Sequence, residues 1–196
     1  MADEVVESDN IKLKWALVRM TASGQEEVLP FTDDIPLLSG QSIKIYLNIQ
    51  NDQYLYLFLL DSSGNLTTIY PPSDMLGNRT KASQLYIPKD DNWFILDDKI
   101  GKETIYIIAS SMRQKKLESL IADLSAVTGY KAIRMREKIL GEMKSLRRKN
   151  SKLAATAEKP ISIAGAIRGS GGEVDLQAKQ VSTLKFYSKT ISIDHR

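Results

Sequence analysis

The chain of 196 residues contains no cysteine and only one histidine. The absence of cysteine excludes disulfide bonds, thiolate metal sites and cysteine nucleophiles. No stretch approaches the roughly 18 to 20 consecutive apolar residues that a membrane-spanning helix needs. Apolar residues make up 42% of the chain and charged residues 26%, which is typical of a globular protein with a sizeable core. We therefore expect a soluble protein without an integral membrane span.

Motifs that would identify an enzyme are also missing. The single histidine, His195, lies next to the last residue, where a side chain is far more often solvated than catalytic. No Gly-x-Ser-x-Gly nucleophile elbow accompanies it. The glycine-rich segment 169–172 lacks the Gly-Lys-Ser/Thr ending of a phosphate-binding loop and is expected to be a flexible loop. The sequence thus predicts no enzymatic activity, no catalytic residues, no cofactor and no metal site.

Three pairs of aspartates lie in segments with turn composition: Asp33-Asp34, Asp90-Asp91 and Asp97-Asp98. Adjacent side chains on an extended backbone point in opposite directions, so we expect solvated turns rather than acid/base or metal sites. The loop from Asp90 to Asp98 would bind calcium only if its oxygens converged, because it lacks the spacing of an EF-hand.

The clearest strand pattern covers residues 41–70. Residues 42–49 alternate polar with isoleucine and leucine side chains, which is the period of a half-buried strand. Tyr54–Leu60 is apolar throughout, as in a central strand covered on both faces. Because Asn51-Asp52 and residues 61–65 are rich in turn formers, the segment predicts a three-stranded meander that ends at Pro71-Pro72.

Further strands are predicted on both sides of this segment. Their expected ranges are 12–20, 85–88, 93–96, 103–110, 161–167 and 181–194. Tyrosines lie on many of the predicted strands, and those on the solvated face would form a docking patch. These tyrosines are Tyr46, Tyr54, Tyr56, Tyr70, Tyr86 and Tyr106.

At Ser111 the hydrophobic period changes from that of a strand to that of a helix. Ser111 and Gln114 have the spacing of a capping box, which predicts a helix from about residue 112 that ends at Gly129. A second helix is expected from about 131 to 152. Both helices are amphipathic, so each should pack one face against the rest of the protein.

These patterns predict an α+β fold, a mainly antiparallel β sandwich or partly open barrel with two amphipathic helices packed on it. Residues 1–10 are expected to be a disordered N-terminus. Residues 11–196 are expected to form a single α+β domain with its helical segment at about 112–152, because strands follow the helices and complete the sheet late.

The segment of residues 40–111 resembles an uncharacterised bacterial family, the domain of unknown function numbered 4384. The resemblance rests on Gly40, residues 51–56, 61–65, 69–71 and 87–88, Gly101 and residues 103–110. It implies an accessory module of bacterial envelope proteins, or one attached to signalling or protease-like domains, without established catalytic residues. Residues 112–196 lie outside the resemblance.

The charge of the chain is unevenly distributed. Residues 113–152 hold 12 Lys and Arg against 4 Asp and Glu, which leaves a net charge of −5 for the remainder. Near a helix C-terminus cations are favoured by the helix dipole alone, yet they also attract anionic partners. The candidate contacts for such a partner are Arg136, Lys144, Arg147, Arg148 and Lys149.

Three functions therefore stay open. The first is a non-catalytic protein-interaction or structural accessory module of a bacterial cell-envelope or secretion-linked assembly, which binds another protein by a sheet edge or a tyrosine-bearing face. The second is a small-ligand-binding or enzymatic domain that uses loop carboxylates and tyrosines. The third is binding to an anionic membrane surface or, less favoured, to nucleic acid through the basic helices.

The N-terminal residues do not form a signal peptide, because they lack a basic region and an apolar region. Ala2-Asp3-Glu4 instead fits the start of a mature chain behind an added initiator methionine. We therefore expect a bacterial periplasmic or envelope location, with the cytoplasm as the alternative.

Overall fold

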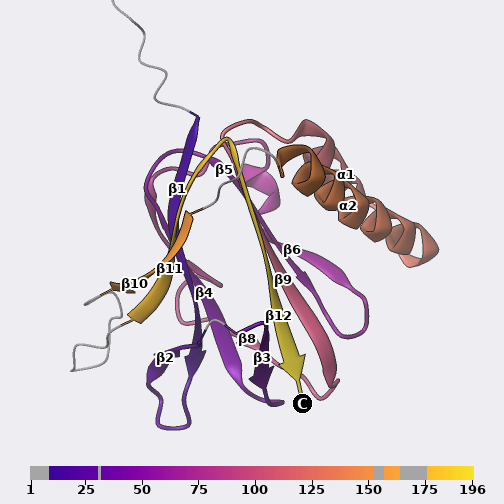
Figure 1. The fold of residues 1–196 in the computed structure, drawn as a ribbon. Helices are drawn as coiled ribbons and strands as arrows, with labels where there is room; N and C mark the ends of the chain where they lie inside the picture. Colours follow the sequence, from indigo (N-terminus) through magenta and orange to yellow (C-terminus); the bar gives the residue numbers. More distant parts are fainter. Residues whose placement is uncertain (1–8, 31, 152–156, 164–175) are drawn as a thin grey trace, which may run out of the picture.

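Two β-sheets packed face to face form the body of the protein, and two helices cover the outer side of one of them (Figure 1). The structure is a computed structural model, and it describes residues 9–30, 32–151, 157–163 and 176–196. The sheets are not closed into a barrel. The predicted α+β sandwich with two packed helices is therefore confirmed.

Sheet A has the strand order β10-β11-β1-β4-β7, with β2 paired to β1 and β8 paired to β4. Its strands are β1 (Asn10–Met20), β2 (Glu26–Val28), β4 (Ser42–Ile49), β7 (Ser83–Ile87), β8 (Phe94–Ile95), β10 (Ala157–Ile163) and β11 (Leu176–Leu184). All of its pairings are antiparallel.

Sheet B has the order β3-β12-β9-β5-β6. Its strands are β3 (Asp34–Leu37), β5 (Tyr54–Leu60), β6 (Leu66–Tyr70), β9 (Gly101–Ser110) and β12 (Phe186–His195). The pairing of β3 with β12 is parallel, and the others are antiparallel. A short 3₁₀ turn, η1 (Ser73–Met75), follows β6.

Strand β5 shows why sheet B is apolar on both faces. Leu55 and Leu57 lie in the core between the two sheets, whereas Tyr56 and Phe58 lie in a second core beneath the helices. Successive side chains of a strand point to opposite faces, so a strand buried on both sides needs the continuous apolar run that Tyr54–Leu60 has. The predicted double burial of this strand is confirmed.

The predicted meander of residues 41–70 is wrong at its first turn. Strand β4 pairs with β1, β7 and β8 in sheet A, whereas β5 pairs with β6 and β9 in sheet B. The turn at Asn51-Asp52 therefore crosses between the sheets of the sandwich. Alternation and turn composition do not distinguish such a crossing from a hairpin, because both need the same local residues.

The predicted final strand, residues 181–194, is likewise two strands in opposite sheets. Strand β11 belongs to sheet A and β12 to sheet B. Lys185 between them has a φ of 60°, in the left-handed region that lets the chain turn sharply. Of the predicted strand at 161–167, residues 164–167 lie outside the described residues, as does the glycine-rich segment 169–172.

The helices are α1 (Lys115–Ser125) and α2 (Gly129–Asn150). The predicted capping box is absent, because the helix begins after Gln114 and its amide Nε2 donates instead to Ser110 Oγ at 2.9 Å. Gly129, expected to end the first helix, has a φ of 60° and begins the second. The capping box is absent because Ser110 and Tyr56 compete for the groups that would form it. The Tyr56 hydroxyl accepts from the backbone amide of Gln114, and Ser110 accepts from its side chain.

Of the predicted disordered N-terminus, residues 1–8 lie outside the described residues, and Asn10 already pairs with Leu184 in sheet A. No helix within the described ranges is both long enough and apolar enough to cross a bilayer.

Candidate functional site

Two features of the molecule gather chemically useful side chains. One is the His195 cluster, which consists of Ser39, Asp97, Glu103 and His195. The other is the outer face of α2. Figure 1 shows the C-terminal end of β12, which carries His195, at the bottom of the view and the helices at the upper right.

The pairing of β9 with β12 brings Glu103 and His195 together. Glu103 lies opposite Ile193, and His195 lies opposite Gly101. Residues opposite each other or two positions apart share one face of a sheet, here the inner face, since Ile193 belongs to the core between the sheets. Accordingly, His195 is only 2% exposed and Glu103 only 7%.

His195 is held through both ring nitrogens. Its Nδ1 lies 3.1 Å from Glu103 Oε1, and its Nε2 lies 3.0 Å from Ser39 Oγ. The parallel pairing of β3 with β12 places Ser39 beside the His195 ring, because Leu37, two residues before Ser39, is the register partner of His195. The Ser39 amide then donates to the carbonyl of Arg196 at 3.2 Å.

The expectation of a solvated His195 is therefore wrong. The end of the chain is a central strand of sheet B, so its inward positions are buried. One feature of the sequence could have shown this: Ile191, Ile193 and His195 continue a single alternating series. Position near a chain end does not determine exposure when the end is paired on both sides.

The contacts of Ser39, His195 and Glu103 follow the order of a Ser-His-acid triad. Acyl transfer by such a triad also needs free amide donors for the developing oxyanion. The amides around Ser39 are engaged within the protein: Leu38 N donates to Gln41 Oε1, Ser39 N to Arg196 O, Gly40 N to Leu96 O, and Gln41 N to Leu38 O. These four amides thus do not form an oxyanion hole.

Asp97 adds a second carboxylate to the cluster. One donor atom each from Asp97, Glu103 and His195 lies within 4.8 Å of the others. Burial raises the pKa of Glu103, the contact with His195 opposes that shift, and the nearby charges of Asp97 and Asp61 raise it further. Two carboxylates and an imidazole therefore lie close together, and burial disfavours the charged form of Glu103.

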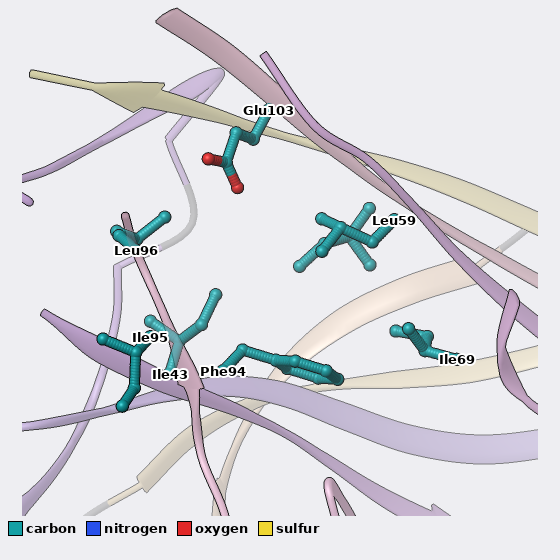
Figure 2. A pocket seen from close by; sticks show the side chains of 8 residues that line it. Ile43, Leu59, Ile69, Phe94, Ile95, Leu96 and Glu103 are labelled. Atoms are coloured by element: carbon teal, nitrogen blue, oxygen red, sulfur yellow. The ribbon is translucent and has the colours of Figure 1, made fainter. Parts of the chain in front are cut away.

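Glu103 also borders an apolar cavity of about 90 Å³ between the two sheets. Figure 2 shows its carboxylate directed toward the space enclosed by side chains of both sheets. The described residues that line the cavity are Ile43, Leu59, Ile69, Phe94, Ile95, Leu96, Glu103 and Ile105. Glu103 is the one charged group among them, in surroundings that strengthen electrostatic interactions.

The outer face of α2 carries exposed cations and two exposed apolar residues. We call this surface the basic helical face; it consists of Tyr130, Ile133, Arg134, Lys138, Lys144 and Arg148, all of them exposed. Tyr130, Arg134 and Lys138 follow one another at intervals of four positions, as do Lys144 and Arg148, so most of them share one side of the helix. The exposed Glu137, three positions after Arg134, lies among them. The guanidinium of Arg134 lies 5.8 Å from the centre of the Tyr130 ring.

Two of the four acidic residues of the helices, Glu118 and Glu142, are turned inward, whereas Asp123 and Glu137 are exposed. Glu118 accepts from Tyr56 and Arg113, at 2.7 and 2.6 Å, and its side chain is 4% exposed. Glu142 pairs with Lys116, and its side chain is 7% exposed. Because these carboxylates are buried beneath the helices, they neutralise little of the charge on the outer face.

The five cations predicted to contact an anionic partner have different environments. Lys144, Arg148 and Lys149 are exposed. Arg147 is exposed but donates to Thr190 Oγ1 at 2.9 Å. Arg136 is partly buried and donates to Asn65 Oδ1 at 2.9 Å. The structure thus brings the first three to free surface and engages the other two with sheet B or its loops.

The tyrosines predicted on strands do not gather on one exposed face. Tyr46, Tyr56 and Tyr70 are buried, and Tyr54, Tyr86 and Tyr106 are partly buried. The tyrosine with a large exposed surface is Tyr130, at 71%. Sequence reasoning missed it because it lies in the first turn of a helix rather than on a strand.

The three aspartate pairs also differ from one another. Asp34 begins β3 and pairs with Lys102 at 3.3 Å. Asp90 and Asp91 are exposed, as expected of a solvated turn. Only Asp97 approaches another carboxylate and a histidine, so the loop oxygens of residues 90–98 do not converge as a calcium loop would require.

Residues 37–113, which are 77 of the 196 residues, match a family model described as "Domain of unknown function (DUF4384)". This confirms the resemblance drawn from residues 40–111. No curated protein and no solved structure matches the chain. The matched segment includes Ser39, Asp97 and Glu103, but His195 and the basic helical face lie outside it.

Proposed function

We propose that this chain, which contains a DUF4384 segment, is a non-catalytic protein-interaction module of a bacterial cell-envelope or secretion-linked assembly, and that it binds an acidic partner protein through the basic helical face. The observation that carries the proposal is the separation of charge across the helices. Two of their four carboxylates, Glu118 and Glu142, lie beneath them. The exposed cations of α2 therefore outnumber its single exposed acid, Glu137.

The composition of the face supports a protein partner. Tyrosine and arginine are enriched among residues that dominate protein interfaces, and Tyr130 lies beside Arg134 on this surface. Ile133, at 49% exposure, supplies apolar area next to them. Surrounding lysines would speed association with an acidic partner and select against basic ones.

Two other anionic partners fit the face less well. An amphipathic helix binds a membrane by burying its apolar side in the interface, but the apolar side of α2, with Ile139, Met143 and Leu146, packs on sheet B. Single-stranded nucleic acid needs aromatic side chains that stack on successive bases, and Tyr130 is the only aromatic residue of α2.

A comparison of two charge-reversed variants tests the proposal. We expect Lys144→Glu with Arg148→Glu to lose an acidic protein that co-purifies with the wild-type chain from extracts of its source cell. The control, Lys12→Glu with Lys89→Glu, makes the same charge change at exposed positions in or beside sheet A and should retain it. Loss from both variants, or from neither, would contradict the proposed surface.

Defined probes separate the classes of partner. A glutamate-rich peptide, vesicles of phosphatidylglycerol and duplex DNA are titrated with the wild-type chain at increasing salt. Preference for the peptide, with affinity that falls as salt rises, supports the proposal. Tighter binding of vesicles or DNA that depends on Lys144 and Arg148 would replace it.

The proposed location, the bacterial periplasm or envelope, rests on the family segment rather than on the basic helical face. It is tested by fractionating cells that carry the native gene and locating the chain with an antibody. Recovery in the cytoplasmic fraction would support the alternative location.

A second candidate, hydrolysis of an ester or amide, is favoured by the alignment of Ser39, His195 and Glu103. The engaged amides around Ser39 argue against it. Incubation with a fluorophosphonate probe distinguishes a hydrolase from a non-catalytic module. An activated serine would be labelled, and the labelling would disappear in Ser39→Ala. We expect no labelling of Ser39.

A further inference from the structure

We propose that Asp97, Glu103 and His195 form a binding site for a divalent transition-metal ion of the zinc class, with Ser39 orienting the histidine. This inference is independent of the basic helical face, and it departs from the expectation of no metal site. It rests on the donor atoms, on their spacing and, within the described residues, on the lack of an ion pair between either carboxylate and lysine or arginine.

The donor atoms match the chemistry of zinc. Zinc binds imidazole nitrogen and carboxylate oxygen at about 2.0 to 2.2 Å, usually with tetrahedral geometry, so two ligand atoms lie about 3.3 Å apart. The separation of His195 Nδ1 and Glu103 Oε1 is 3.1 Å. An ion bound by both atoms would replace the proton shared between them and keep them near their present separation.

The third donor comes from a more adaptable position. Asp97 is exposed and follows β8, and its Oδ1 accepts from the Lys99 amide at 2.8 Å. The set of donor atoms spans up to 4.8 Å, so binding requires Asp97 to approach the other two by rotation of its side chain. A fourth position would be left for water.

The negative charges of the site lack a lysine or arginine partner. Within the described part of the chain, neither Asp97 nor Glu103 forms an ion pair with lysine or arginine. His195 is the single hydrogen-bond partner of the Glu103 side chain there, through Oε1. Among the described residues, Glu103 Oε2 has no hydrogen-bond partner. The Glu103 side chain is about nine-tenths buried and is directed into the cavity (Figure 2).

Ser39 supplies the outer partner that metal-bound histidines usually have. A histidine that binds a metal through one nitrogen carries its proton on the other, and a hydrogen bond from that N–H fixes the ring. Here the Nε2–H would donate to Ser39 Oγ, which lies at 3.0 Å. The ring orientation required for metal binding by Nδ1 is thus already set.

The same donors do not suit calcium or magnesium. Calcium takes six to eight oxygen ligands, and magnesium is held in an octahedron of oxygens with several retained waters. A set of one imidazole and two carboxylates instead matches zinc, which binds both kinds of ligand with tetrahedral geometry. The apolar cavity beside Glu103 would limit access of water and so strengthen the interaction between the ion and the carboxylates.

The test is calorimetric titration of the full chain, free of any affinity tag, with Zn²⁺, followed by the visible absorption of bound Co²⁺. We expect one ion per chain, a tetrahedral Co²⁺ spectrum and a higher Tm with Zn²⁺. Asp97→Asn and Glu103→Gln should weaken Zn²⁺ binding by at least about tenfold. Ser39→Ala should weaken it by about tenfold to a hundredfold, as outer partners of metal ligands do.

Asp98→Asn is the matched control, because Asp98 is the exposed neighbour of Asp97 and lies outside the cluster. It should bind Zn²⁺ like the wild type. Asp97→Asn replaces an exposed residue, so its folding should be intact by circular dichroism, which keeps the test valid even where Glu103→Gln does not fold. Absence of binding to the wild type, equal loss in Asp98→Asn, or equal stabilisation by Ca²⁺ would overturn the proposal.

Discussion

The indole Nε1 of Trp15 donates a 2.8 Å hydrogen bond to the phenolic oxygen of Tyr187. Trp15 lies in β1 of sheet A and Tyr187 in β12 of sheet B. The Tyr187 hydroxyl in turn donates to Glu158 Oε1 of β10 at 3.0 Å. The two sheets are thus joined by a short polar chain within a largely apolar interface.

We predict that Tyr187→Phe lowers the free energy of unfolding by about 1 to 3 kcal/mol, the cost of leaving buried polar groups without partners. The substitution keeps the ring but removes the acceptor of the Trp15 N–H and the donor to Glu158. Urea denaturation followed by tryptophan fluorescence measures the change. The control is Tyr130→Phe, at an exposed helical position, which should leave stability within about 0.5 kcal/mol.

Alkaline pH should destabilise the protein through its buried tyrosines. Burial raises the pKa of Tyr187 in the folded state, as it does that of Tyr56. A group whose folded pKa lies above its unfolded value, about 10 for tyrosine, contributes full stability below that value and loses it as pH rises. The urea midpoint should therefore fall between about pH 9 and pH 11, and fall less steeply in Tyr187→Phe. A midpoint independent of pH in this range would contradict the prediction.

Attachment of α1 to sheet B should depend on Glu118. Glu118→Ala removes the acceptor of the buried Tyr56 hydroxyl and the ion-pair partner of Arg113. We expect a loss of about 1 to 3 kcal/mol in the free energy of unfolding, because the Tyr56 hydroxyl proton loses its acceptor and Arg113 its ion-pair partner. Asp123→Ala on the same helix is exposed and should change stability by less than about 0.5 kcal/mol. Equal effects of the two substitutions would show that Glu118 has no special role.

Replacement of Gly101 and of Gly141 by alanine should change the free energy of unfolding in opposite directions. Gly101 has a φ of 144°, and an added Cβ would lie 3.0 Å from Ser62 Cβ. Gly101→Ala should therefore cost about 1 to 3 kcal/mol, the range for a residue forced into a rarely populated conformation. Gly141 lies within α2 with open space around its Cβ position, so Gly141→Ala should stabilise by up to about 1 kcal/mol. Thermal denaturation of both variants measures whether each substitution lowers or raises the stability.

The alternating apolar pattern and the change to helical period predicted most elements and the fold class. Strand β5 is an example, because its run of apolar residues demands burial on both faces wherever it lies. The start of α1 was not predictable in this way. Ser111 and Gln114 have the spacing of a capping box, but Ser110 and Tyr56, brought near by the folded sheet, bind the same groups.

The basic segment was visible in the sequence, but its free surface was not. All five predicted cations lie on α2, yet Arg136 and Arg147 hydrogen-bond to Asn65 and Thr190. Those partners are 71 and 43 residues away along the chain. Which cations stay exposed depends on the angle at which the helix packs, and helical period alone does not determine that angle.

The sequence by itself determined most local elements, the α+β class, the charge of the helical segment and the family resemblance of residues 40–111, which the match over 37–113 confirms, because each of these depends on neighbours in the chain. Only the tertiary structure decided that β4 and β5 belong to different sheets and that His195 is buried beside Glu103. Glu103 and His195 are 92 positions apart, and strand pairing between distant segments, which sets such contacts, leaves no fixed spacing in the sequence.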